Sequence, residues 1–270
     1  MYKEYLPSPI LLPYIDKYWE FEGESQPGMR INILPDGCTD FIFTLGEAFE
    51  AVNGGLLMQP YHSYFVGPMR KYSELFTHSR TVHMFGIRFL PCGVSCFMTL
   101  PLCELADRRL SVNDMDTFWD DSFAEQLYEK QHTRKRIDFV ETFLLKRLAG
   151  SNLAADTRIR YAVDYINRYK GQQPIRFLAD EVCLCQRHFE RTFKMYTGFS
   201  PKEYSRIIKF RHAVDLLRAT SSDNLISVAV DAGYYDVSHL SKEIKNMSGS
   251  TAGSFLSIPQ DDITLTYVER

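Results

Sequence analysis

The sequence predicts two domains, a β-rich N-terminal domain of the α+β class and an all-α C-terminal domain that carries one helical unit twice. Three observations predict this division. Segments of strand composition fill residues 1 to about 90, apolar positions follow a helical spacing after Pro91, and a pattern near the C-terminus recurs after about fifty residues. A chain of 270 residues is long enough for two domains of ordinary size.

Short segments rich in β-branched and aromatic residues make up the N-terminal region. They are Tyr18–Gly23, Arg30–Gly46, Ser63–Pro68, Tyr72–His78 and Thr81–Phe89. Gly, Pro and Asn residues separate them, as at Asp36-Gly37, where a turn between two apolar runs predicts a hairpin or a corner. Five or more closely spaced strands are typical of a sandwich or a barrel.

Helical spacing begins after Pro91. The segments Gly93–Leu100, Asp120–Tyr128 and Thr133–Leu148 are predicted helices, and the last carries one apolar stripe. Such a stripe packs on its own domain or on a partner helix in a dimer, and both interpretations stay open. Small and turn-forming residues follow it and mark a domain boundary. We therefore expect a first domain over 1–150, a linker over 151–157, a second domain over 158–258 and a tail over 259–270.

The C-terminal region repeats a short helix, a tight turn and a second helix. The two copies are Ile175–Tyr204 and Ile226–Phe255, and they are predicted to align on their glycines without a gap. Apolar anchor positions recur in the second helix of each copy. A long helix from Pro201 to about Ala219 links the copies, with Ser200 as its cap and proline at its first turn.

This arrangement is the helix-turn-helix, whose second helix lies in the major groove of DNA. The side chains left facing outward are mostly polar or basic, the types that read base edges or hold phosphates. Lys and Arg outnumber Asp and Glu by 15 to 10 over 158–258, which favours an anionic partner although the whole chain carries −3. The predicted DNA contacts are Gln186, Arg187, Glu190, Arg191 and Lys194 in the first copy and Val237, Ser238, Ser241, Lys242 and Lys245 in the second.

Three stretches carry a family resemblance: LADEVCLCQRHFERTFKMYTGFSPKEY, RHAVDLLRAT and VAVDAGYYDVSHLSKEIKNMSG. They resemble the DNA-binding domain of the AraC/XylS family of bacterial transcription regulators. The second copy departs from the family pattern at Lys242, Ile244 and Ala252, where Arg, Phe and Pro are usual. Because Lys cannot form the bidentate fork of Arg, we expect the second copy to hold mainly phosphates.

The N-terminal half resembles a cupin-like sensor domain found in one branch of the same family. The stretches that carry this resemblance are LPDGCTDFIFTLG and HMFGIRFLPCGVSCFMTLPLCELADR. It implies a barrel with appended helices that senses a small-molecule effector, dimerises, or both. The family further implies a cytoplasmic homodimer that regulates transcription by binding double-stranded DNA and acting with RNA polymerase. We expect the protein to activate transcription, and repression stays open.

Effector contacts are predicted at aromatic and basic residues on or beside the strands, with an aromatic core and surface arginines as the alternative. They are Trp19, Tyr61, Tyr64, Arg70 and Arg88. A competing interpretation is a small-molecule-binding or metal-dependent cupin enzyme with a helical interaction tail. The chain has no His-x-His pair of the kind that metal-binding cupins carry, so we expect no metal, no cofactor and no enzyme activity.

The cysteines and the hydropathy pattern argue against several other classes of protein. Cys92 follows a proline as the reactive cysteine of DNA alkyl transferases does, but glycine stands where their histidine is expected. Cys183 and Cys185 are expected to pack at the helix crossing and not to sense redox state. No apolar run reaches the roughly 18 residues of a membrane span, and the N-terminus lacks the pattern of a secretory signal.

Overall fold

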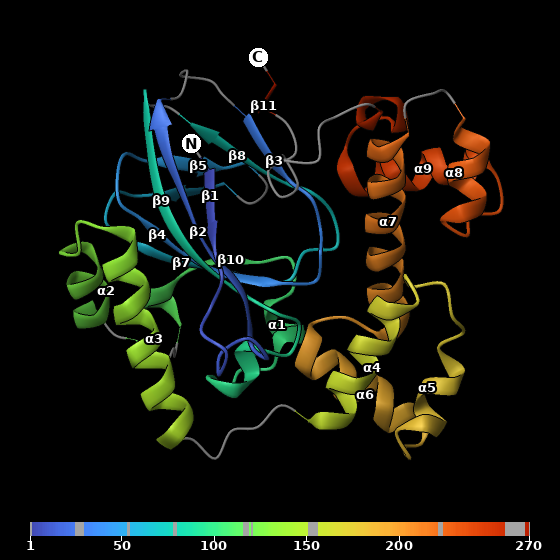
Figure 1. The fold of residues 1–270 in the computed structure, drawn as a ribbon, viewed down its shortest axis with the longest axis horizontal. Coiled ribbons are helices and arrows are strands. Elements are labelled where there is room, and N and C mark those ends of the chain that lie inside the picture. The colour runs from blue at the N-terminus through green and yellow to red at the C-terminus, as the bar shows by residue number, and fades with distance from the viewer. Residues whose placement is uncertain are drawn as a thin grey trace.

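A computed structural model of the protein describes residues 2–24, 30–52, 55–77, 80–115, 119, 121–150, 156–220, 224–256 and 268–269. Within these residues the strands form two antiparallel sheets in the N-terminal half, and the C-terminal half is helical. Figure 1 shows the sheets on one side of the molecule and the C-terminal helices on the other. The predicted fold class is confirmed.

Each sheet is built from strands that are far apart in the sequence. The first sheet has the order β1-β2-β9-β4-β7-β10, and the second has the order β11-β3-β8-β5-β6. Strands of the first sheet are β1 (Tyr2–Tyr5), β2 (Ile15–Glu24), β4 (Thr39–Thr44), β7 (Ser63–Val66), β9 (Thr81–Phe89) and β10 (Arg109–Ser111). Strands of the second are β3 (Arg30–Ile33), β5 (Phe49–Ala51), β6 (Leu56–Met58), β8 (Ser73–Thr77) and β11 (Val268–Glu269).

The turn at Asp36-Gly37 is a corner between the sheets, because β3 belongs to the second sheet and β4 to the first. Gly37 has a φ of +82°, a left-handed conformation that favours glycine. A Cβ atom at this position would also lie 2.5 Å from Cε2 of Tyr204. The corner therefore needs glycine both for its backbone and for its contact with the C-terminal domain.

The first sheet is covered on both faces. Aromatic residues of one face, including Phe41 and Phe43, pack with Trp119 against α2 (Asp121–Tyr128) and α3 (Thr133–Gly150). Residues of the other face, such as Ile42 and Tyr64, lie in a separate core with side chains of the second sheet. This two-sided burial follows from the alternation of side chains along each strand.

The apolar stripe of α3 packs within its own domain, because Ile137, Val140 and Leu144 are buried in the core beside the first sheet. The predicted helix over Gly93–Leu100 is wrong. Only a 3-10 turn, Val94–Cys96, forms there, before α1 (Leu102–Leu105). Pro101 disfavours a helical conformation in the residue before it, which limits any helix in this segment. The 151–157 linker falls mostly on residues that are not described, and it stays a prediction.

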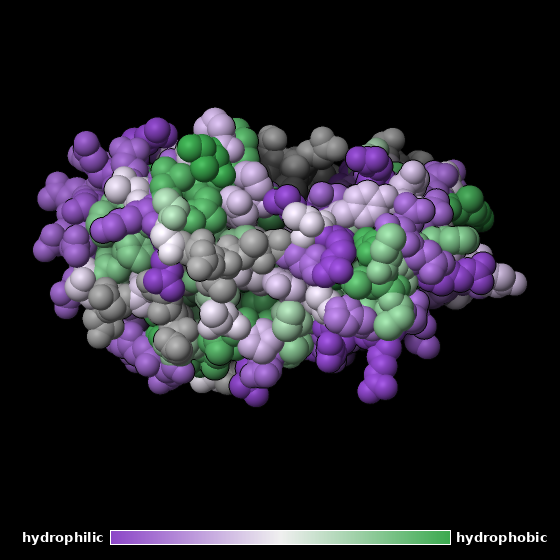
Figure 2. Space-filling view, turned by 90° about the horizontal axis from the view of Figure 1, so that it is seen from below, coloured by the Kyte–Doolittle hydropathy of each residue, from purple (hydrophilic) through white to green (hydrophobic). Residues whose placement is uncertain are grey.

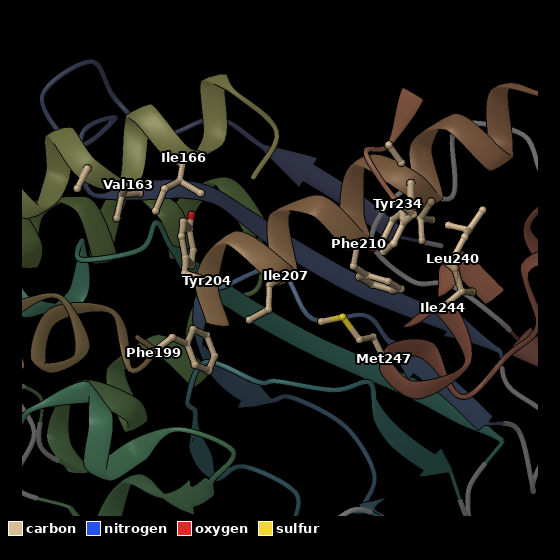
Figure 3. Packing of buried hydrophobic residues seen from close by; sticks show 14 of the residues in the cluster. Val163, Ile166, Phe199, Tyr204, Ile207, Phe210, Tyr234, Leu240, Ile244 and Met247 are labelled. Carbon is tan, nitrogen blue, oxygen red and sulfur yellow. The ribbon is translucent and has the colours of Figure 1, made fainter. Parts of the chain in front are cut away.

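The C-terminal domain is organised around α7 (Pro201–Ala219). Ser200 and Glu203 form a reciprocal capping box at its start, as Ser followed by Pro at the first turn predicts. Figure 3 shows Tyr204, Ile207 and Phe210 in line along α7. The helices packed on it are α4 (Thr157–Arg168), α6 (Gln186–Thr197), α8 (Leu225–Asp231) and α9 (Val237–Ser248), and α5 (Arg176–Glu181) packs on α6.

The surface is mixed in polarity. Seen from below, hydrophilic residues predominate at the outer ends of the molecule, and hydrophobic residues gather in smaller patches between them (Figure 2). Single exposed apolar side chains such as Leu6 and Ile10 are ordinary on protein surfaces. Among the described residues, no helix combines the length and the apolar character that crossing a membrane requires.

Candidate DNA-binding surface and effector cavity

The first helix-turn-helix unit consists of α5 and α6. Leu178 and Ala179 are buried on α5, and Phe189 and Phe193 of α6 are fully buried beneath them. The turn reverses at Cys183, whose φ is +53°. The helix ends at Gly198 in the left-handed conformation, with its N–H donating to the carbonyl of Lys194.

All five predicted contact residues of α6 are exposed. The set is Gln186, Arg187, Glu190, Arg191 and Lys194. The side-chain amide of Gln186 donates to the carboxylate of Glu190 one turn later, which fixes both on the helix surface. Because Arg187, Arg191 and Lys194 are three or four residues apart, they follow one stripe of the helix. The exposed face of α6 therefore presents three cations and one amide–carboxylate pair.

The second unit consists of α8 and α9 and is built in the same way. Leu240 and Ile244 are fully buried, and α9 ends at Gly249 in the left-handed conformation. Asp236 caps α9 by accepting a hydrogen bond of 2.6 Å from the N–H of His239. Of the predicted contact residues, Ser238, Lys242 and Lys245 are exposed, and Val237 and Ser241 are half-buried.

The ungapped alignment of the two units is wrong. Leu178 corresponds to Val228 at an offset of 50 residues, whereas Gly198 corresponds to Gly249 at an offset of 51. The extra residue lies in the second turn, because four residues, 182–185, separate α5 from α6 and five, 232–236, separate α8 from α9. The longer turn accommodates Asp236, which caps α9 with its side chain, whereas Cys185 at the start of α6 makes no such bond.

The two units pack at opposite ends of α7. The ring of Phe193 on α6 lies 5.8 Å from the ring of Tyr204 at one end, and Figure 3 shows Leu240, Ile244 and Met247 near Phe210 at the other. Arg206 on α7 donates to Glu243 on α9 at 2.8 Å, and the ammonium of Lys209 lies 4.6 Å from the centroid of the Tyr234 ring. These contacts fix the second unit on the linking helix.

A cavity of about 60 Å³ lies between the two sheets. Its walls are mainly apolar, with Trp19, Ile42 and Met84 from the first sheet and Ile31 and Leu75 from the second. Small molecules bind in such mainly apolar pockets with a few polar groups. The cavity is therefore the candidate effector site of the N-terminal domain.

Three charged side chains belong to one row of the first sheet, and two of them, Arg88 and Asp40, line the cavity. Arg88, Asp40, Val66 and Arg109 are successive register partners on β9, β4, β7 and β10, so they share one face of the sheet. Arg88 Nη2 pairs with Asp36 at the corner and lies 3.6 Å from Asp40 Oδ2. Arg109 donates to the hydroxyl of Ser73 on β8.

Burial and neighbouring charges shift the pKa values of the charged residues in this row. Burial raises the pKa of Asp40, although the nearby Arg88 opposes the shift. Burial acts to lower the pKa of Arg88, but Asp36 and Asp40 outweigh it and hold that pKa well above the usual value. Burial lowers the pKa of Arg109 to about 10, with only a small opposing contribution from Asp40. Both guanidinium groups thus remain charged at neutral pH.

The structure places the five predicted effector residues in three regions. Trp19 and Arg88 line the cavity. Tyr64 is buried in the core next to it, and its hydroxyl accepts a hydrogen bond of 2.6 Å from the N–H of Gln59. Tyr61 is 62% exposed in the turn before β7 and is not part of the cavity wall. Arg70 lies at the contact between the domains, where it pairs with Asp107 and Glu203.

Sequence reasoning did not single out Asp36 and Asp40 as cavity residues or Arg109 as a member of the same row. Their role depends on strand register and on the corner between sheets, and neither could be read from strand composition. The period-2 alternation along β4, which buries Phe41 and Phe43 on the opposite face from Asp40, was the one signal that could have pointed to this site.

One group of possible metal ligands forms on the outer part of the first sheet. The ligand atoms of Glu20, Glu22 and His83 lie within 4.8 Å of one another. Arg136 and Thr133 of α3 already donate to Glu20. Although burial acts in the opposite direction, hydrogen bonds from His83 and Thr133 and the charge of Arg136 lower the pKa of Glu20. The group thus serves as an ion-pair network that ties β2 and β9 to α3.

The cysteines differ in exposure. Cys92 is 1% exposed, and burial raises the pKa of its thiol well above the usual range, so it lacks the thiolate that nucleophilic chemistry needs. Cys183 and Cys185 are both exposed, and the expectation that they pack at the helix crossing is wrong. The crossing is filled by Leu178, Ala179 and Phe189 instead.

Two family models match the chain. A model described as "Helix-turn-helix domain" matches residues 178–257, and one described as "Domain of unknown function (DUF6597)" matches residues 3–111. The first match spans the two units whose geometry is given above. The C-terminal region is an AraC-type helix-turn-helix domain. The resemblance predicted from its sequence motifs is confirmed.

Two proteins of known name are similar to this chain. The lactose operon transcription activator of Staphylococcus xylosus is 38% identical over 137 residues, which is 50% of this chain and 45% of that protein. The chain thus spans about half the length of this curated relative. The structure of ToxT from Vibrio cholerae covers 88% of this chain and 97% of its own, with a TM-score of 0.52 and 8% identity. That likeness of fold includes the N-terminal half as well as the helical half.

Proposed function

We propose that this protein is a sequence-specific, double-stranded-DNA-binding transcription regulator of the AraC type. The observation that carries the proposal is the pair of helix-turn-helix units fixed on α7, each with exposed cations on its second helix. Phosphate contacts from such cations supply affinity, and polar side chains on the same helix face supply sequence discrimination. Two units in one chain would enter successive major-groove segments, about one helical turn apart.

The N-terminal domain provides the signal input in this proposal. A small-molecule effector would occupy the cavity between the sheets and change how the AraC-type domain engages DNA. A homodimer, contact with RNA polymerase and a cytoplasmic location belong to the same proposal and follow from the family resemblance. Enzyme activity is not part of it, because the comparisons point to transcription regulators.

Selection of random duplex DNA by the full-length protein tests the function. We expect enrichment of a motif with two boxes about 10 base pairs apart, centre to centre. Affinity for that motif should fall steeply with salt, because each phosphate contact releases a counterion. Binding without any enriched motif would refute sequence-specific regulation, and the absence of DNA binding would refute the function as a whole.

A further inference from the structure

Buried charges of both signs gather at one end of the cavity. Arg88, Asp36 and Asp40 line it, and Arg109 follows Arg88 and Asp40 in the charged row of the first sheet. Asp36 pairs with Arg88 and lies 3.5 Å from the half-buried Arg211 of α7, and Asp40 lies 3.6 Å from Arg88. Burial raises the pKa of Asp40, which acts against the charged form of the carboxylate that stands between Arg88 and Arg109 in the row.

Several donors in this group have no acceptor. The Nε of Arg88 and both Nε and Nη1 of Arg109 are buried without a hydrogen-bond partner among the described residues. Arg88 is 5% exposed and lines the cavity, and Arg109 donates to Ser73, which lines it too. Buried charges are normally paired, and a buried donor without an acceptor destabilises the fold. An anion at this point would satisfy both requirements.

We propose that the cavity binds a small carboxylate with a short apolar chain. This proposal rests on the effector role proposed above and names the chemical class of the effector. The carboxylate would accept from Arg88 and Arg109, and the chain would lie against Ile42 and Met84. A water needs about 10–15 Å³ of such volume, so 60 Å³ admits a molecule the size of about five waters. An amine would add a further positive charge to the group.

Calorimetric titration of the full-length protein with butanoate, butan-1-ol and butylamine tests the ligand class. The three probes share one alkyl chain and differ in charge. We expect butanoate to bind at least about tenfold more tightly than the other two, because only it accepts charge-assisted hydrogen bonds. Equal binding of the alcohol or the amine would overturn the proposal, as would the absence of binding by all three.

The variant Arg109→Gln tests whether Arg109 binds the carboxylate. It should weaken butanoate binding by about tenfold or more without lowering the unfolding temperature, because it removes an uncompensated buried charge. Arg30→Gln is the control, since Arg30 is an exposed arginine paired with Glu74 on the second sheet. Butanoate affinity of Arg109→Gln equal to that of the wild type would overturn the proposal. DNA selection without butanoate reports separately on the proposed function.

A second inference comes from the contacts of residues 67–73, which comprise the connection from β7 to β8 and the first residue of β8. Gly67, Met69 and Ser73 line the cavity. Pro68 and Tyr72, between them in sequence, contact the AraC-type domain instead. This connecting segment therefore has one side in the effector cavity and the other against the DNA-binding half.

The connecting segment contacts both helix-turn-helix units at equivalent positions. A Cβ at Gly198 would lie 2.5 Å from Cγ of Pro68, and one at Gly249 would lie 2.7 Å from Cζ of Tyr72. These glycines are the left-handed ends of α6 and α9. The N–H of Tyr72 also donates to the carbonyl of Met247 at 2.7 Å.

Arg70 adds a further contact with the first unit. Its Nε lies 3.0 Å from Oε1 of Glu203, and its guanidinium lies 5.4 Å from the centroid of the Phe199 ring. Phe199 lies between α6 and α7, and Glu203 lies in the first turn of α7, where the first unit joins this helix. The connecting segment is thus attached to the ends of both DNA-contacting helices.

We infer that this segment couples the occupancy of the cavity by an effector to the spacing of the two helix-turn-helix units. Tyr72→Ala would free the second unit from it. The measurement is the ratio of affinities for the selected DNA site and for the same site with one base pair inserted between its boxes. We expect this ratio to fall at least about fivefold, the lower end of ordinary coupling between sites.

Two further variants sharpen this test. Arg70→Gln frees the first unit and should lower the same ratio, whereas Tyr61→Ala removes an exposed tyrosine outside this contact and should leave the ratio unchanged. An unchanged ratio in Tyr72→Ala would overturn the inference. So would a wild-type protein that binds its motif equally well at both spacings, a result that leaves sequence-specific DNA binding intact.

Discussion

Replacement of Arg191 by alanine tests the DNA-binding surface most directly. Arg191 is exposed on α6, in the middle of the stripe that includes Arg187 and Lys194. It makes no ion pair within the part of the chain that the structure describes, so its loss should change the free energy of unfolding by less than about 0.5 kcal/mol. The whole effect should therefore appear in DNA binding.

The expected loss can be estimated from the chemistry of the contact. An arginine that forms a bidentate contact with a base contributes about 1–3 kcal/mol, which corresponds to a decrease in affinity of roughly 5-fold to 150-fold. Fluorescence anisotropy with the selected site and a scrambled duplex, repeated over a range of salt concentrations, measures it. A base contact predicts a larger loss on the selected site than on the scrambled one. Unchanged affinity for the selected site would refute the assignment of α6 as the DNA-contacting helix.

Three further predictions concern charge and burial. Lys242→Ala should weaken selected and scrambled DNA alike and reduce the slope of log affinity against log salt by about 1 in anisotropy titrations, as loss of a phosphate contact requires. Glu20→Gln should lower the free energy of unfolding by about 3 kcal/mol at pH 7, because it leaves Arg136 buried without its 2.8 Å partner. The pKa of Glu20 in the folded protein is lowered, so the stability that its ionised form contributes is lost as pH falls through that value. In denaturant titrations, the difference in free energy of unfolding between Glu20→Gln and the wild type should therefore be smaller in acid. Iodoacetamide should label the exposed Cys183 and spare the buried Cys92 in the folded protein, as mass spectrometry of the peptides would show.

The helical half could be predicted closely from the sequence because its signals are local. The cap at Ser200, the glycine at 198 and the apolar pair of Phe189 and Phe193 each act within one or two turns of helix. The outward set on α6 followed from this spacing and is exposed as expected. The extra residue in the second turn was missed, because glycine positions alone do not show where an insertion lies.

The N-terminal half was predicted less completely because its organisation is non-local. Strand composition located β2, β7, β8 and β9, but it could not show that β3 and β4 belong to different sheets. Sheet order determines which side chains share a face. The charged row of the cavity therefore appeared only in the structure, and short strands such as β10 have too few residues to produce an alternation signal.

The position of the cavity explains why its wall contains charged groups at all. A cavity that served only as a core would be more stable with apolar residues at these positions, because buried ion pairs often contribute less than well-packed hydrophobic groups. Asp36 instead pairs with Arg88 on the cavity side and lies within reach of Arg211 on α7, while Gly37 beside it packs on the ring of Tyr204. The same short corner thus lines the candidate effector cavity and contacts the helix that links the two DNA-binding units. An anion that drew Arg88 away from Asp36 would leave that carboxylate to Arg211, and the change would reach α7 without any movement of the sheet.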